Sequence, residues 1–245
     1  MIARYAAFLC LATFFTIAHA APFKVYSPVV ESGVTEVEAY GFRDFDRRDS
    51  VDRSQTHKVG IGYGFTDHWF SEIYGEWEKE GPGALKTESF EWENRFQFAP
   101  QGKYWIDTGL LIEYERAYHR DDPDKITIAP LFEKELGSRT VATLNLIFSQ
   151  KTGTNAPSGT NFAYAARLKY NLHPLYEPAI EFFGEPGRIS HFPEHSSQEH
   201  WAGPAVYGKA KLGHGHAFVY SAALLFGLTD AASDKRAVLR AEYEF

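Results

Sequence analysis

The feature of this chain that most restricts its fold is an alternation of apolar and polar residues with a period of two. In residues 87–98 the apolar side chains are Phe90, Trp92, Phe96 and Phe98, and the polar ones between them are Glu91, Glu93, Arg95 and Gln97. Because successive side chains of a β-strand point to opposite faces, this pattern predicts a strand with one apolar and one polar face.

The same pattern recurs along almost the whole chain. It predicts twelve strands, near residues 34–45, 56–65, 69–79, 87–98, 103–116, 125–136, 139–151, 161–171, 175–184, 199–211, 215–227 and 235–245. The connections alternate in length, from tight turns such as Gly137-Ser138 to loops such as residues 185–198. Twelve strands joined in this way predict an all-β fold, a closed antiparallel transmembrane β-barrel with short periplasmic turns and longer extracellular loops.

The first twenty residues have the features of a secretory signal peptide. Arg4 supplies a positive charge, residues 6–17 form an apolar run, and Ala18-His19-Ala20 fits the small-x-small cleavage pattern. We therefore expect residues 1–20 to be cleaved. Residues 21–32 would then form a periplasmic lead or a plug folded into the lumen, and residues 33–245 would form the barrel.

The last predicted strand places Tyr243 and Phe245 on its apolar face. With the signal peptide and the alternating loops, an end of the form Tyr243-x-Phe245 resembles that of a bacterial outer-membrane β-barrel. This resemblance covers residues 33–245 and implies that the barrel-assembly machinery recognises the strand ending at Phe245. More narrowly, three stretches resemble a group of uncharacterised porin-like barrels: Val25-Tyr26-Ser27-Pro28, Phe65-Thr66-Asp67-His68-Trp69-Phe70 and Glu91-Trp92-Glu93-Asn94.

Composition and charge argue against several other classes of protein. The formal net charge is −7 and no basic stripe is present, which argues against a nucleic-acid partner. Cys10 is the one cysteine and lies in the predicted signal peptide, so the mature chain would have no disulfide or thiol nucleophile. A soluble periplasmic β-sandwich also alternates with period two, but twelve regular strands with aromatic residues near both ends favour the barrel.

If the apolar face meets lipid, the polar face lines the lumen. The predicted pore-lining residues are Lys58, Glu72, Glu76, Glu91, Glu93, Arg95, Asp107, Glu113, Glu133, Glu135, Arg167, Lys169, Lys209, Lys211 and Arg240. Acidic residues gather on the third to sixth predicted strands and basic residues on the eighth, tenth and twelfth. Because excess carboxylates at a constriction favour cations, we expect a porin-like channel for passive passage of small solutes, with a preference for cations.

A closed lumen is the alternative. A barrel of about eight strands is filled by side chains, whereas about sixteen strands leave an aqueous channel, and twelve falls between them. If the inner charges pair across a closed lumen, the barrel would instead bind a ligand, a metal or a partner through its extracellular loops. The excess of acids and three glycines on one predicted inner face, Gly60, Gly62 and Gly64, favour an opening.

The longest predicted loop ends in a histidine-rich stretch. His191, His195 and His200 are candidate ligands for a transition metal, although their spacing matches no established motif and an exposed polar loop is the simpler interpretation. The pair His195-x-Ser197 has the spacing found in the outer-membrane phospholipases, but no matching Asn follows. A lipid-modifying hydrolase is therefore the third interpretation, and the sequence as a whole indicates no enzyme and no cofactor.

These observations together predict a protein of the bacterial outer membrane, exported by a cleaved signal peptide. Its expected partners are outer-membrane lipid, the barrel-assembly machinery and small solutes.

Overall fold

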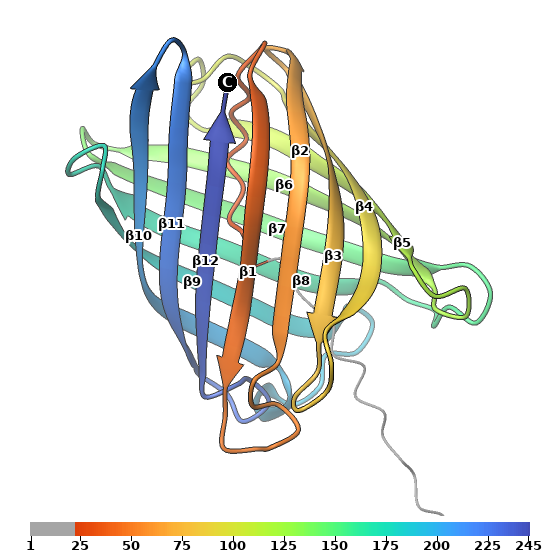
Figure 1. The fold of residues 1–245 in the computed structure, drawn as a ribbon. Coiled ribbons are helices and arrows are strands. Elements are labelled where there is room, and N and C mark those ends of the chain that lie inside the picture. Colours follow the sequence, from red (N-terminus) through yellow and green to blue (C-terminus); the bar gives the residue numbers. More distant parts are fainter. Residues whose placement is uncertain (1–22) are drawn as a thin grey trace, which may run out of the picture.

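The computed structural model describes residues 23–245 and shows a closed barrel of twelve antiparallel strands (Figure 1). The strands are β1 (Thr35–Phe45), β2 (Gln55–Thr66), β3 (Trp69–Lys79), β4 (Lys86–Gln97), β5 (Asp107–Ala117), β6 (Asp124–Leu136), β7 (Thr140–Thr152), β8 (Asn161–Tyr170), β9 (Glu177–Arg188), β10 (Glu199–Gly213), β11 (His216–Gly227) and β12 (Lys235–Glu244). Each strand pairs with its neighbours in sequence, and β12 closes the barrel against β1. The predicted fold class is confirmed.

Two strand boundaries lie four residues from those predicted. β5 begins at Asp107 rather than at residue 103, because the Asp107 carboxylate accepts a hydrogen bond from the Gly102 N–H at 2.7 Å and stabilises a turn before the strand. β9 continues to Arg188 although the apolar alternation stops near residue 184, because its backbone still pairs with β8 and β10. The predicted signal peptide, residues 1–20, lies outside the described residues.

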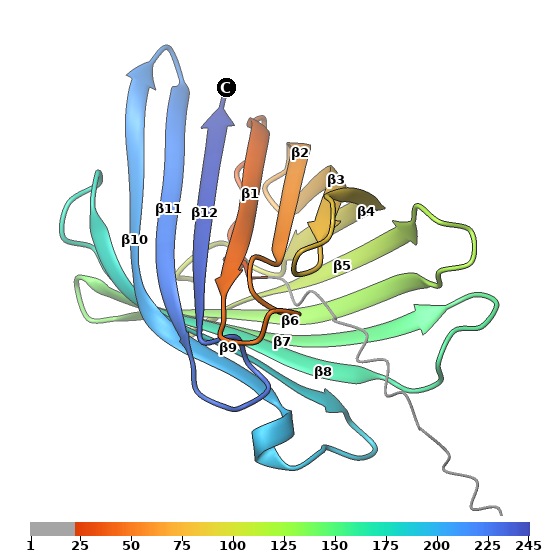
Figure 2. The same ribbon diagram turned by 60° about the horizontal axis from the view of Figure 1, so that its bottom comes forward.

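The two ends of the barrel differ in their connections. The end called here the turn end carries the β2–β3, β4–β5, β6–β7, β8–β9 and β10–β11 connections, together with Thr35 at the start of β1 and Phe245. The opposite end, called the loop end, carries the remaining connections, among them the β9–β10 loop with the short helix η1 (His195–Ser197) (Figure 2). The β4–β5 connection, residues 98–106, is longer than the other turns. Within residues 23–245, no helix is long and apolar enough to cross a membrane.

The outer face of the barrel is apolar along the middle of the strands. Exposed outward side chains include Val37, Val59, Ile61, Ile73, Trp92, Ile128, Ile180, Phe182 and Leu239. A continuous apolar surface of this kind is unfavourable in water and matches the lipid-facing band of a transmembrane barrel.

The inner face carries both polar and apolar side chains. Buried carboxylates line β3, β4 and β5, as the alternation predicts. On β5 to β9 apolar side chains also face inward, with Leu111, Ala129, Leu131, Ile147, Ala165 and Phe183 all at most 4% exposed. Apolar side chains inside a barrel need packing partners, and Phe23, Val25 and Tyr26 provide them.

Candidate functional site: a lumen occupied by the N-terminal segment

Residues 23–32, called here the N-terminal segment, run through the lumen from the turn end to the loop end. At the turn end, the backbone that directly follows the segment pairs with β2. The Gly33 N–H donates to the Gly64 carbonyl at 2.8 Å, and the Gly64 N–H donates to the Val34 carbonyl at 2.9 Å. At the other extreme the Phe23 ring lies 5.1 Å from the Trp201 ring, close to the start of β10. The segment therefore spans most of the height of the barrel.

Side chains of the barrel hold the backbone of the N-terminal segment. The Asn145 carboxamide accepts a hydrogen bond from the Tyr26 N–H and donates one to the Tyr26 carbonyl, both at 2.8 Å. The Gln97 side-chain oxygen accepts from the Val30 N–H at 2.8 Å. These contacts satisfy polar backbone groups that burial in the lumen removes from water.

Two inward-facing glycines leave room for the N-terminal segment. A Cβ added at Gly64 would lie 1.9 Å from the Glu31 carbonyl oxygen, and one added at Gly109 would lie 2.9 Å from the Pro28 Cβ. At Gly60 and Gly62 the space is filled by the rings of Tyr74 and Phe70. The sequence suggested that Gly60, Gly62 and Gly64 leave an opening, but the space at each of them is filled by other parts of the protein.

Phe23 lies in an aromatic pocket at the loop end. Its ring is 5.0 Å from that of Phe42 and 5.1 Å from that of Phe183, and the Arg236 guanidinium lies 3.8 Å above it. Arg236 is fixed by two hydrogen bonds of 2.7 Å to Asp44. The pocket is therefore held in shape by contacts within the barrel wall as well as by Phe23.

Lysines lie among the inward-facing carboxylates of β3, β4 and β5. Lys58 forms ion pairs with Glu91 and, at 3.6 Å, with Glu76, and Lys125 pairs with Glu115. Among the described residues, the buried acids are Glu38, Asp44, Glu72, Glu76, Glu91, Glu93, Glu113, Glu133, Glu181, Glu242 and Glu244, whereas the buried bases are Lys24, Lys58 and Arg236. Half-buried Lys125, Arg167 and Arg240 reduce this excess of negative charge without removing it.

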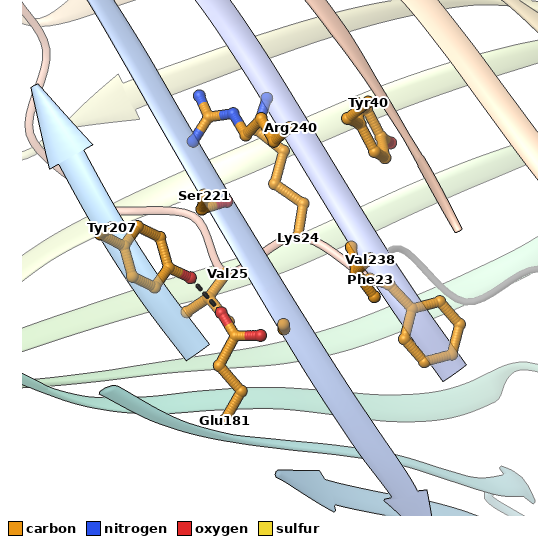
Figure 3. A pocket seen from close by; sticks show the side chains of 10 residues that line it. Phe23, Lys24, Val25, Tyr40, Glu181, Tyr207, Ser221, Val238 and Arg240 are labelled. Carbon is orange, nitrogen blue, oxygen red and sulfur yellow. Dashed lines mark hydrogen bonds between the residues drawn. The ribbon is translucent and has the colours of Figure 1, made fainter. Parts of the chain in front are cut away.

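A small hollow remains beside the N-terminal segment on the β9–β12 side (Figure 3). Its volume is about 10 Å³, which is room for about one water molecule. Lys24, Tyr40 and Arg240 lie on one side, and Tyr207 donates a hydrogen bond to Glu181 on the other. The lumen beside the segment is thus narrow and lined by both polar and apolar side chains.

The structure places the predicted pore-lining residues at several depths. Lys58, Glu72, Glu76, Glu91, Glu93, Glu113 and Glu133 are buried inside the barrel. Arg167 reaches Glu133 at 3.7 Å, Arg240 pairs with Glu38, and the Arg95 guanidinium lies over the Phe70 ring. Lys169, Lys209 and Asp107 lie near the turn end, and Glu135 and Lys211 are exposed there.

The three candidate metal-binding histidines do not form a common site. Within residues 23–245, each trio of ligand atoms close enough to share a metal consists of glutamates alone. His195 and His200 stack at 5.3 Å, but both ring nitrogens of His200 have partners, the Tyr164 hydroxyl and the Gln198 side chain, each at 3.0 Å. His191 is exposed in the loop. The imidazole of His200 is therefore engaged in side-chain hydrogen bonds at the rim.

Several side chains that contact one another across the lumen were not singled out from the sequence. They are Lys24, Tyr26, Glu38, Tyr74 and Asn145. Asn145 is the one with a local signal, because it is a polar residue on the inner face between Thr143 and Ile147. The others are recognisable only once the N-terminal segment is known to enter the lumen.

Comparisons with known proteins agree on the architecture. No family model matches the chain, and no curated protein matches it. Among solved structures, an outer-membrane channel from Pseudomonas putida F1 superposes with a TM-score of 0.62 at 10% identity, covering 93% of this chain and 100% of that one. The NanC porin gives a TM-score of 0.56 at 6% identity, with 85% and 98% covered. The translocator domain of the autotransporter NalP from Neisseria meningitidis gives 0.56 at 11% identity, with 88% of each chain covered.

The fold is that of a bacterial outer-membrane β-barrel. At these identities the likeness extends to the architecture and not to the side chains of the lumen. The neighbours also include both channels and a translocator domain, so the activity of this chain has to be argued from its own interior.

Proposed function

We propose that this protein is an outer-membrane, porin-like channel for the passive passage of small solutes, with a preference for cations. The observation that carries the proposal is the excess of buried carboxylates over buried cationic groups in a closed barrel. A narrow passage lined by negative charge attracts cations and repels anions. The porin and channel structures with the same architecture support this proposal.

The proposed orientation places the turn end in the periplasm and the loop end outside the cell, as in other barrels with short turns on one side. The N-terminal segment would then lie in the lumen with Ser32 at the periplasmic end and Phe23 at the extracellular end. In this orientation the N-terminal segment narrows the route between the two sides. Passage of anything larger than a small ion would require the segment to shift.

The C-terminal strand is proposed to guide insertion. Phe245 exchanges two backbone hydrogen bonds of 2.9 Å with Thr35, so the last residue also closes the barrel seam. The side chains of Tyr243 and Phe245 are exposed on the outside and stack beside His216. A terminal aromatic group in this position is available to the barrel-assembly machinery.

Planar-bilayer recordings test the proposed channel. The mature chain and a variant lacking residues 23–31 are compared across a salt gradient. Discrete currents with a reversal potential of the cation-selective sign, larger in the shortened variant, are expected. Anion selectivity would contradict the charge argument, and silence from both folded barrels would contradict the channel and favour a closed barrel that binds through its extracellular loops.

A further inference from the structure

The Lys24 side chain lies in a cage of tyrosines and glutamates inside the lumen. Its ammonium donates hydrogen bonds to Glu38 at 2.6 Å and to the Tyr74 hydroxyl at 2.9 Å, and it lies 3.9 Å from Glu72. Its nitrogen is also 5.6 Å from the centre of the Tyr40 ring. Carboxylates and aromatic faces around one nitrogen are the groups that recognise an ammonium ion.

The cage belongs to the barrel, whereas the ammonium that occupies it does not. Glu38 and Tyr40 are on β1, and Glu72 and Tyr74 are on β3. Only the Tyr26 ring, 4.8 Å from the Lys24 nitrogen, comes from the N-terminal segment. Removal of the segment would leave four of the five groups in place.

Gly60 makes the cage possible. It lies on β2 between the two strands, opposite Glu38 on one side and Tyr74 on the other. A Cβ at this position would be 2.4 Å from the Tyr74 ring. The glycine therefore lets the tyrosine lie across β2, where its hydroxyl donates a hydrogen bond to Glu38 at 2.6 Å.

The cage keeps polar groups that Lys24 does not satisfy. The second carboxylate oxygen of Glu72 and the hydroxyl of Tyr40 are buried without a hydrogen-bond partner, on residues that are 3% and 7% exposed. Buried polar groups are normally paired, so two unpaired ones beside an ammonium site indicate capacity for further donors and acceptors. The narrow hollow lined by Lys24 and Tyr40 adjoins the same place (Figure 3).

From this geometry we infer that the lumen contains a binding site for organic solutes with a primary ammonium group, and that Lys24 occupies it in their place. The inference rests on the proposed function, whose preference for cations it narrows to one chemical class. Glu38 pairs with the half-buried Arg240, which also pairs with Glu242, and Glu72 adds a further carboxylate, so the site stays negative without Lys24. A primary ammonium fits better than a quaternary one, because only N–H groups can donate to Glu38 and Tyr74.

Chemical rescue tests the inference in the full mature chain. The Lys24→Ala variant is prepared in detergent and titrated with n-propylammonium, which matches the part of the lysine side chain from Cγ to Nζ that the variant lacks. Saturable binding with a raised Tm is expected, and propyltrimethylammonium should bind at least tenfold more weakly. Lys24→Met is the matched control, because its side chain fills the same space without charge and should leave no room for the amine.

Removal of the carboxylate distinguishes the cage from general attraction to an acidic lumen. In the double variant Lys24→Ala/Glu38→Gln, propylammonium binding should weaken at least tenfold. In Lys24→Ala/Glu181→Gln, which removes a lumen carboxylate hydrogen-bonded to Tyr207 instead, it should change less than twofold. Equal binding to both double variants, or no difference between the two amines, would overturn the proposed site.

The binding assay is independent of conductance. A barrel that binds propylammonium through Glu38 but carries no current would retain the ammonium site and lose the proposed channel. A barrel that conducts cations but neither binds the amine in the Lys24→Ala variant nor is blocked by it would retain the channel and lose the site. The two proposals can therefore fail separately.

Discussion

Asn145 on β7 forms two hydrogen bonds with the backbone of Tyr26. Its side-chain oxygen accepts from the Tyr26 N–H and its side-chain NH₂ donates to the Tyr26 carbonyl, both at 2.8 Å. The two residues are 119 positions apart in the sequence, and Asn145 is completely buried. A paired contact of this kind resembles one rung of a β-ladder, supplied by a side chain. It fixes the middle of the N-terminal segment at one height in the lumen.

Replacement of Asn145 by Ala should release the segment. Two buried backbone groups of Tyr26 would lose their partners, at a cost of about 1–3 kcal/mol each. Trypsin cleavage after Lys24 in the native protein measures the release, because that site is buried while the segment is bound. Since each 1.4 kcal/mol corresponds to about a factor of ten, cleavage should accelerate at least tenfold.

The matched control for this variant is Asn94→Ala. Asn94 accepts a hydrogen bond from the Trp69 indole at 3.0 Å on the outer face, away from the segment. Trypsin should cleave the Asn94→Ala variant after Lys24 at the same rate as the parent protein. A similar acceleration in both variants would mean that loss of barrel stability, and not loss of the Tyr26 contact, exposes Lys24.

Replacement of Gly64 by Ala should push the base of the segment out of the lumen. The new Cβ would lie 1.9 Å from the backbone carbonyl of Glu31, a distance that no side-chain rotation relieves. Single-channel conductance should therefore rise toward that of the variant lacking residues 23–31. Gly75→Ala, where the new Cβ meets only the Trp77 ring at 3.1 Å, is the control, and conductance unchanged from the parent at Gly64→Ala would refute the prediction.

Replacement of Phe23 by Ala should empty the aromatic pocket at the loop end. Truncation of a buried Phe costs about 3–5 kcal/mol, which is comparable to the other contacts that hold the segment. Trp201, 1% exposed and beside Phe23, should become accessible to acrylamide and shift its fluorescence to the red. The same substitution in a Trp201→Phe background should show no shift, and a shift that persists there would assign the signal to another tryptophan.

The loops at the barrel seam should loosen in acid. Asp46 accepts hydrogen bonds from Arg48, which lower the pKa of its carboxyl from 3.8 to about 2, and from the Asp234 N–H at 3.0 Å. Because the pKa is lower in the folded state, the stabilisation is complete above about pH 4 and is lost as the pH falls toward 2. Arg48 in turn donates to the Ala232 carbonyl at 2.8 Å, which joins the β1–β2 and β11–β12 loops.

The Asp46→Asn variant measures this link. Its Tm should be lower than that of the parent at neutral pH, and the difference should shrink as the pH falls from about 4 to 2, the range over which Asp46 takes up its proton. Thermal unfolding followed by circular dichroism across this range gives the comparison. A Tm difference that stays constant down to pH 2 would show that the carboxylate charge is not what joins the loops.

The strands were predictable from the sequence because the alternation of apolar and polar residues is set by residues next to one another in the chain. Alternation along β4 assigned Glu91 and Glu93 to one face and Trp92 to the other, and the structure buries the first two and exposes the third. Strand boundaries were less certain, since the turn at Gly102 depends on a single hydrogen bond to Asp107. The closed order of strands followed from their number and from the short connections.

What fills the lumen was decided only by the tertiary structure. The sequence left residues 21–32 as a lead or a plug, and residues 23–30 are inside the barrel, with Glu31 and Ser32 exposed at the turn end. Lys24 lies between Glu38 and Tyr74, and Phe23 lies under Arg236, more than two hundred positions away. Alternation fixes the face on which a side chain lies, but it carries no information on which distant segment meets that face. Closure of the barrel brings those groups together, and with them the ammonium cage.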